Sequence, residues 1–357
     1  MSGASAGVLD LARPDIRGLE PYSHAAWIPS MRRLHANEAP WRPAGDRTTA
    51  GLNRYPEPQP ASLLARLAAL YGVGVDCLLV GRGSDEAIDV LSRIFLRAGA
   101  DSILQCAPTF GMYKVAAHIQ GAAVAEVALE PAQNWDLDAE RLLAAWQPPM
   151  KLVYLCSPNN PTGNSFDLEA LERVCTALEG RAIIVIDEAY IEWSRRASLV
   201  GWLQRFSTLA VIRTLSKAHA LAGARVGALI ARPELIELAR RVIPPYSLAQ
   251  PTIESALAAL EPAALEDARA RVAALIEERS YLRARLAASP LVAKIWPSDA
   301  NFLLIDCRDA DRFMRACTAG GTLVRDMRAN PALPSSLRVT VGTRAENEAL
   351  LSSLEAA

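Results

Sequence analysis

Short apolar runs alternate with amphipathic segments along the middle of the chain. Continuous apolar runs predict strands at 77–80, 102–106, 123–127, 152–156, 182–186, 209–213 and 227–230. Apolar residues that recur about every 3.6 positions predict helices between them, at 85–97, 111–120, 167–178 and 199–206. Strands that are apolar throughout and separated by helices are typical of a mostly parallel sheet with helices on both faces. We therefore expect an α/β fold.

The pattern differs on either side of this region. Residues 1–60 contain eight prolines, which break any long helix, and aromatic residues that we expect to dock onto another surface, for example that of another subunit. Beyond Pro245, a long helix at 263–288 precedes expected strands at 300–305, 322–325 and 337–341 and helices at 310–319 and from 345. The sequence thus predicts an arm with part of a small domain at 1–40, a large domain at 41–245 and a smaller α+β domain at 246–357.

Composition excludes several classes of function. The 357 residues carry 38 Lys+Arg and 39 Asp+Glu, so the chain lacks the overall positive field that gathers nucleic acid or anionic membrane. Its apolar runs are too short to cross a bilayer, and its first residues lack the pattern of a signal peptide. Six cysteines without a C-x-x-C motif and four scattered histidines give no zinc cluster. We expect a cytoplasmic, reduced protein without a metal.

A lysine directly follows one of the apolar strands. Residues 211–217 read VIRTLSK, with hydroxyls at Thr214 and Ser216, the amine of Lys217, and Arg225 eight positions later. Partial burial lowers the pKa of such an amine and makes it a usable nucleophile. The hydroxyls and the guanidinium would supply donors for an anion beside it. A solvated loop lysine is the alternative.

Two acidic residues follow the apolar strand predicted at 182–186, in the sequence DEAY at 187–190. This places Asp187 at the carboxyl edge of the sheet, where open α/β sheets bind ligands. A carboxylate held in an apolar setting needs a cation, and a protonated pyridine nitrogen is one. Tyr190 is close enough in sequence to reach the same ligand. A metal-binding or ion-paired acid is the alternative.

Two loops offer further polar groups. The segment GRGSDEA at 81–87 joins a strand to a helix that begins near Asp85, and such a helix start suits a phosphate or serves as an ordinary N-cap. The rigid turn SPNNPTG at 157–163 can aim its Asn side chains at a ligand. Arg338 inside an apolar strand and Arg325 at the end of another indicate an anionic substrate or internal salt bridges.

Together these motifs resemble the fold-type I, class I and II aminotransferases. SPNNPTG, DEAY, TLSK followed by Arg225, and LRVTVG at 337–342 occur in the order of that family. More narrowly, the segments at 16–22, 37–38, 52–56, 83–86, 108–113 and 323–326 resemble the histidinol-phosphate aminotransferases. The resemblance implies pyridoxal 5′-phosphate as cofactor, a large domain with a mostly parallel sheet, a smaller α+β domain and a homodimer.

The resemblance also implies residue roles. Lys217 would bind the cofactor covalently and act with Asp187 and Tyr190 in catalysis, Asp187 pairing with the pyridinium nitrogen while Tyr190 and Asn160 bond the ring oxygen. The remaining cofactor residues implied are Ser84, Asp85, Phe110, Thr214, Ser216, Arg225 and, from the other subunit, Tyr55. The substrate residues implied are Tyr22, Asn37, Arg325 and Arg338. Phe110 and Trp41 depart from the usual residues, and Phe110 lacks a hydroxyl that the family often has.

The expected reaction is transamination between L-histidinol phosphate and 2-oxoglutarate, giving imidazole acetol phosphate and L-glutamate, and it runs in reverse in histidine biosynthesis. An aminotransferase for aromatic or other amino acids needs the same cofactor residues and is the nearest alternative. A phospho-amino-acid decarboxylase on the same scaffold is another. A regulator that binds the cofactor without catalysis is a third, although the arm shows no basic helix-turn-helix segment.

Overall fold

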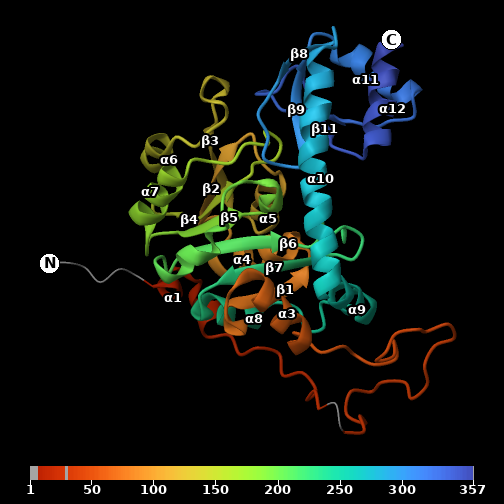
Figure 1. Ribbon diagram of the computed structural model, residues 1–357. Coiled ribbons are helices and arrows are strands. Elements are labelled where there is room, and N and C mark those ends of the chain that lie inside the picture. Colours follow the sequence, from red (N-terminus) through yellow and green to blue (C-terminus); the bar gives the residue numbers. More distant parts are fainter. Residues whose placement is uncertain (1–6, 29–30, 357) are drawn as a thin grey trace.

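The chain folds around two sheets in the computed structural model, which describes residues 7–28 and 31–356 (Figure 1). The larger sheet has seven strands in the order β1-β7-β6-β5-β4-β2-β3. Its strands are β1 (Leu78–Arg82), β2 (Ser102–Ala107), β3 (Ala123–Ala128), β4 (Met150–Cys156), β5 (Ile183–Asp187), β6 (Leu209–Thr214) and β7 (Val226–Ala231). The five strands β2 to β6 all run parallel to one another, whereas β7 is antiparallel to both β6 and β1. The expected mostly parallel sheet is confirmed.

Helices cover both faces of this sheet, which explains why its central strands are apolar throughout. Along β5, Ile184 and Ile186 belong to one core cluster, whereas Ile183 and Val185 belong to the other. The covering helices are α3 (Ala61–Tyr71) and α7 (Leu168–Leu178) on the first face, and α4 (Ser84–Phe95), α5 (Met112–Ile119) and α8 (Pro233–Val242) on the second. Successive side chains of a strand point to opposite faces, so each strand contributes to both cores.

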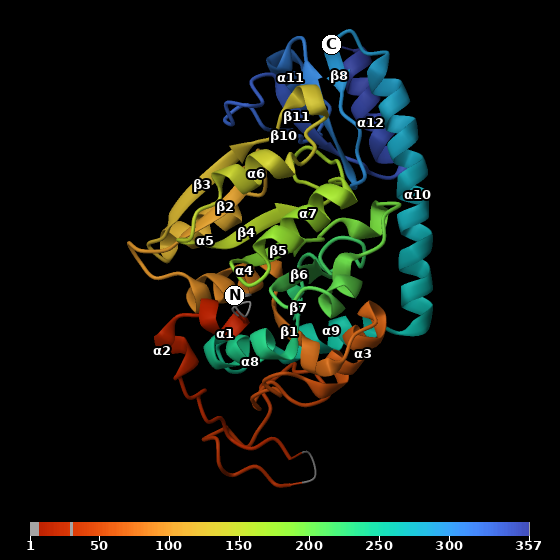
Figure 2. The ribbon, with the colours of Figure 1, turned by 90° about the vertical axis from the view of Figure 1, so that its left-hand side faces the viewer.

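A second sheet of four antiparallel strands has its own core. Its order is β10 (Arg325–Asp326), β11 (Ser336–Thr340), β9 (Phe302–Cys307) and β8 (Val292–Ile295). Helices α11 (Ala310–Ala319) and α12 (Arg344–Glu355) pack on it through Phe313 and Leu351. Figures 1 and 2 show α10 (Pro262–Ala287) running from α9 (Gln250–Ala259) beside the large sheet to the small one. The limits of the domains at residues 40 and 245 stay a prediction.

The structure differs locally from the sequence-based expectations. The segment predicted as a helix at 199–206 is a 3-10 helix, Leu199–Gln204, with Gly201 in its interior, where glycine weakens an α-helix. The strand predicted at 322–325 pairs only through Arg325 and Asp326, at an exposed edge. Short helices α1 (Val8–Leu11), α2 (Pro14–Arg17) and α6 (Ala139–Ala145) were not predicted. No helix among the described residues is long and apolar enough to span a membrane.

The antiparallel pair β1 and β7 fixes the start of α4. Gly227 on β7 lies opposite Gly81 on β1, and the chain turns through Gly83 into α4 at Ser84. A Cβ atom on Gly227 would lie 2.3 Å from both the carbonyl carbon of Gly83 and the backbone nitrogen of Ser84. The close approach of these two backbones therefore depends on glycine at 227.

We predict that Gly227→Ala lowers the free energy of unfolding by about 1–3 kcal/mol, because backbone atoms at the start of α4 must move to admit the methyl group. Thermal or denaturant unfolding measures the change. Gly201→Ala is the control, since a Cβ atom there meets nothing within 4 Å. Equal stability of the two variants would contradict the packing described here.

Candidate active site

A cavity lies at the edge of the large sheet where β4, β5 and β6 end. It is lined by Ser84, Asp85, Phe110, Cys156, Asn160, Asp187, Ala189, Tyr190, Thr214, Ser216, Lys217, Ala222 and Arg225. Parallel strands bring their carboxyl ends to a common edge, so residues far apart in sequence meet here.

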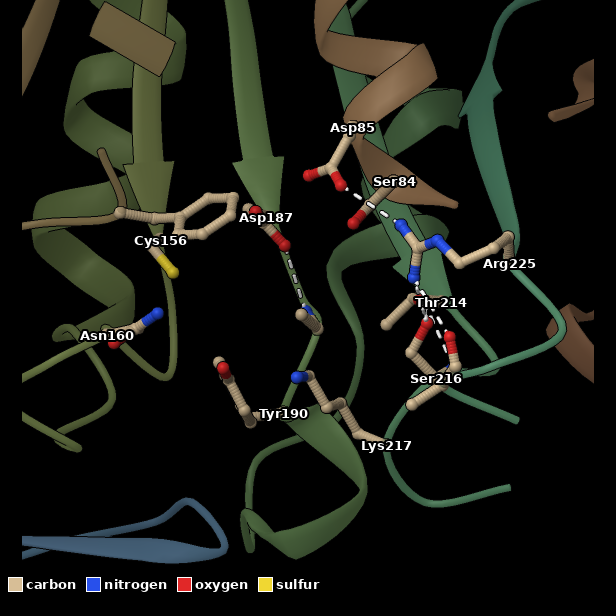
Figure 3. A pocket seen from close by; sticks show the side chains of 13 residues that line it. Ser84, Asp85, Cys156, Asn160, Asp187, Tyr190, Thr214, Ser216, Lys217 and Arg225 are labelled. Carbon is tan, nitrogen blue, oxygen red and sulfur yellow. Dashed lines mark hydrogen bonds and ion pairs between the residues drawn. The ribbon is translucent and has the colours of Figure 1, made fainter. Parts of the chain in front are cut away.

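One end of the cavity carries groups that suit an anion (Figure 3). Helix α4 begins at Ser84, and no side chain caps the N–H groups of its first turn. Arg225 donates to Asp85 Oδ2 at 3.0 Å and to Ser216 Oγ at 3.5 Å. The backbone of Arg225 has φ of 61°, a left-handed conformation that costs about 1–3 kcal/mol in a residue with a side chain. Uncapped amides, a helix dipole and a guanidinium together favour a phosphate.

The hydroxyls at the end of β6 complete this anion site. The Oγ1 atom of Thr214 lies 2.9 Å from Ser216 Oγ and accepts the backbone N–H of Ser216 at 3.1 Å. A tight turn of this kind presents both hydroxyls on the side of Arg225, as Figure 3 shows. The predicted phosphate residues are thus brought together.

Asp187, the last residue of β5, sits in the middle of the cavity and is only 2% exposed. Its Oδ2 accepts the Tyr113 hydroxyl at 2.7 Å and its Oδ1 accepts the Ala189 N–H at 3.0 Å. Burial raises the pKa of Asp187 to about 6, although these hydrogen bonds oppose the rise. Among the described residues no cation forms an ion pair with it, so this carboxylate is suited to a cationic ligand.

Lys217 extends from the loop after β6 toward the same space as Asp187 (Figure 3). Burial, together with the positive charges of Arg338 and Arg225, lowers the pKa of its amine. A larger fraction of neutral amine makes Lys217 a better nucleophile and base. Its Nζ lies 5.7 Å from the ring centre of Tyr190, which packs edge-on against Phe302 at 5.1 Å.

The small sheet contributes to the site through Arg338 on β11. Its guanidinium donates to Oδ1 of Asn160, which lies in the turn after β4 at the cavity wall, and lies 5.2 Å from the ring of Phe302. Burial lowers the pKa of Arg338, with the charge of Arg325 adding to the effect. Arg325 is the residue directly opposite Arg338 in the antiparallel pair, so both side chains leave the same face of the sheet.

Comparison with known protein families identifies the family to which this chain belongs. The family described as "Aminotransferase class I and II" matches residues 33–354. The chain belongs to the class I and II aminotransferases.

Its relatives narrow the family further. The aminotransferase is 46% identical to the histidinol-phosphate aminotransferase of Stenotrophomonas maltophilia, over 98% of this chain and 97% of the relative. It is 44% identical to that of Xanthomonas euvesicatoria, over 99% and 98%. Its fold matches the histidinol-phosphate aminotransferase of Sinorhizobium meliloti, solved in complex with pyridoxal 5′-phosphate, with a TM-score of 0.76, 25% identity and coverage of 84% and 82%. Within the class, the chain therefore groups with the histidinol-phosphate aminotransferases.

Ten of the residues predicted from sequence as cofactor-binding line the same cavity, and Arg338 reaches it through Asn160. Four others do not line it, and one of these, Arg325, is exposed on β10. Tyr55 stacks on Tyr246 with ring centres 4.7 Å apart and borders another cavity with Asn37. Tyr22 is 70% exposed and lines a third. The roles assigned to all these residues stay predictions.

Besides Ala189 and Ala222 of the lining, sequence reasoning missed two residues of the site that carry a thiol or a hydroxyl. Cys156 lines the cavity, and burial raises the pKa of its thiol, so it stays neutral. Tyr113 lies behind Asp187 and bonds to it. The segment 111–120 was predicted as an amphipathic helix, in which an aromatic residue on the apolar face looks like an ordinary core residue. Only the structure reveals that its hydroxyl meets a carboxylate.

The buried charge of Asp187 predicts a stability change in the cofactor-free aminotransferase. The native pKa of about 6 lies above the value of 3.8 for an exposed aspartate, so native-state stability falls as the pH rises through that interval. Asp187→Asn removes this cost, and we expect the variant to be about 1–3 kcal/mol more stable than the parent at pH 8, with the gain lost below about pH 4.

Denaturant unfolding at several pH values measures this difference. Asp101→Asn is the control, for which we expect a stability change of the opposite sign. Asp101 is also buried, at 3% exposed, but hydrogen bonds from Arg97 outweigh burial and lower its pKa. That variant should lose stability at pH 8. A loss of stability in Asp187→Asn would show that Asp187 already has adequate partners within the protein.

Proposed function

We propose that this protein is a pyridoxal 5′-phosphate-dependent aminotransferase that interconverts L-histidinol phosphate and 2-oxoglutarate with imidazole acetol phosphate and L-glutamate. In histidine biosynthesis the reaction runs toward histidinol phosphate. The observation that carries the proposal is the single cavity that holds the amine of Lys217, the buried carboxylate of Asp187 and the anion site around Arg225. The near full-length similarity to histidinol-phosphate aminotransferases supports the choice of substrate.

The chemistry of the cavity fits this cofactor. Its anion site lies at one side, Asn160 lies at the other, and Asp187 and Lys217 lie between them (Figure 3). A Cβ atom on Gly83 would come within 2.5 Å of the Arg225 guanidinium, so the anion site has room for backbone only at that point. The buried carboxylate without a cationic partner suits a pyridinium nitrogen, and the anion site suits the cofactor phosphate.

When bound, the cofactor supplies an aldehyde that condenses with amines and a protonated ring that withdraws electrons. Lys217 would hold it covalently through Nζ, and as a free amine Nζ would take the α-proton of the substrate as a base and return a proton as an acid. Asp187 would keep the ring nitrogen protonated. The hydroxyl of Tyr190 and the amide of Asn160 would orient the ring through its oxygen, with Phe110 stacked on its face.

The substrates would bind on the side of the small sheet. A guanidinium fork binds either a carboxylate or a phosphate through paired hydrogen bonds, so Arg338 and Arg325 suit both glutamate and a phosphate monoester in turn. We assign Tyr55 to the cofactor phosphate, and Tyr22 and Asn37 to the substrate. Since Tyr55 and Tyr22 are exposed and lie outside the cavity of their own chain, they would serve a second copy, which makes the enzyme a homodimer.

The direct test is a spectral half-reaction of the purified, cofactor-loaded enzyme. L-Histidinol phosphate, L-histidinol and L-phenylalanine are added separately, and the absorbance of the lysine-bound cofactor is followed. We expect fast conversion with the phosphorylated amine alone, and none in Lys217→Ala. The variant Lys294→Ala, which changes an exposed lysine on β8, should convert like the parent.

Each other outcome overturns a defined part of the proposal. Equal or faster conversion of phenylalanine would indicate an aromatic aminotransferase. Release of carbon dioxide from phosphorylated amino acids would indicate a decarboxylase. Absence of the cofactor band would exclude the whole cofactor assignment.

Arg325 offers a test of the substrate phosphate site. We predict that Arg325→Gln raises KM for L-histidinol phosphate about tenfold or more, because a charged hydrogen bond to the phosphate is lost. The matched control is Arg328→Gln: Arg328 lies three residues away, but its charge is already paired with Asp326 and Asp311, each at 2.8 Å. An unchanged KM in Arg325→Gln, or equal increases in both variants, would remove Arg325 from the substrate site.

A further inference from the structure

Tyr113 is a fully buried tyrosine whose hydroxyl faces the cavity from behind. It lies on α5, is 0% exposed, and donates to Oδ2 of Asp187 at 2.7 Å. It does not line the cavity itself, so a ligand there contacts Asp187 and not Tyr113. The hydroxyl of Tyr113 therefore acts on a ligand through the carboxylate that it bonds.

The ring of Tyr113 is held in place by other rings. It stacks on Tyr154 of β4 with centres 4.5 Å apart and planes within 8°, and it meets Phe110 edge-on at 5.6 Å and 83°. Tyr154 is itself 1% exposed. A ring fixed on both sides has little freedom to turn its hydroxyl away, so the hydrogen bond to Asp187 is preorganised.

We propose that Tyr113 is a positioning residue that keeps the Asp187 carboxylate ionised and oriented toward the ring nitrogen of the cofactor. This inference rests on the proposed function, because it assigns the ring nitrogen as the partner of Asp187. The Tyr113 hydroxyl acts through Asp187, so Tyr113 is not a catalytic residue. Its hydroxyl stabilises the negative charge of the Asp187 carboxylate, which burial destabilises.

The groups around Asp187 support this role. Besides Tyr113 of α5 and the Ala189 N–H, it faces Cys156 of β4, Asp85 of α4, Lys217 and Tyr190. Burial and, to a smaller extent, the negative charge of Asp85 raise the pKa of Asp187, whereas the two hydrogen bonds and the charge of Lys217 lower it. Burial raises the pKa of Tyr113 well above its usual value, so its hydroxyl keeps its proton and remains a donor at every working pH. Tyr113 therefore donates a hydrogen bond to Asp187 at every working pH, and this bond opposes the effect of burial on the Asp187 carboxylate.

The test uses the affinity of the cofactor-free protein for pyridoxal 5′-phosphate between about pH 5 and 8, followed by absorbance. Affinity should fall as Asp187 becomes protonated, and we expect the midpoint to be about one pH unit higher in Tyr113→Phe than in the parent, because a donor to the carboxylate is lost. Asp187→Asn is the reference variant. Its affinity for the cofactor should show no change from titration of residue 187, and only the titration of the cofactor phosphate should remain.

Tyr154→Phe is the matched control. It also removes one hydroxyl from a fully buried ring of the same stack, but that hydroxyl makes no hydrogen bond to Asp187. Its midpoint should equal that of the parent. Replacement of Tyr113 by 3-fluorotyrosine strengthens the donor without removing it and should move the midpoint downward, which keeps the test open if Tyr113→Phe folds poorly.

Steady-state kinetics provide the second readout. In Tyr113→Phe we expect kcat to fall about tenfold while KM for both substrates changes less than about twofold, because Tyr113 does not touch the substrate. Equal midpoints in Tyr113→Phe and Tyr154→Phe, with a functional parent, would overturn the inference alone. A parent that neither binds the cofactor nor transaminates would overturn the proposed function instead.

Discussion

A carboxylate buried at the end of a parallel strand is the constraint on which the site depends. Asp187 pays a desolvation cost that two hydrogen bonds offset only in part. The sheet holds the acid there because its neighbours β4 and β6 are hydrogen-bonded to β5 on both sides. The cost becomes useful once a cation binds, since attraction between opposite charges is strong where water is excluded. Under the proposed function, the stability lost by burying Asp187 would be recovered as affinity for a cationic ring.

The rest of the architecture surrounds this carboxylate with complementary groups. Parallel strands deliver Lys217 and Asn160 to the same edge, and the antiparallel pair β1 and β7 brings the start of α4 and Arg225 together at one side. The second sheet reaches the cavity through Arg338, which bonds to Asn160. The two sheets therefore meet at the wall of the cavity. Under the proposed function, this contact would connect a substrate bound at Arg338 with a cofactor bound at Asn160.

Much of this follows from the sequence, for identifiable reasons. Lys217 and Asp187 directly follow apolar strands, so a parallel sheet necessarily brings them to one edge. The Arg338–Asn160 contact could not be predicted in the same way, because it depends on how the two sheets pack. Tyr113 was missed because its helix pattern resembles that of any core helix. Tyr55 lies in the irregular segment before α3 and outside the cavity lined by Asp187, so neither the sequence pattern nor this fold places it at the site.

The central claim is that Asp187 pairs with a protonated ring nitrogen. The most direct measurement is the 15N NMR shift of pyridoxal 5′-phosphate, labelled at that nitrogen and bound to the enzyme near pH 8. The account predicts the shift of a protonated pyridinium, with the proton lost in Asp187→Asn. The shift of an unprotonated pyridine in the parent enzyme would contradict it, because a buried carboxylate beside a neutral ring would have no electrostatic purpose at this position.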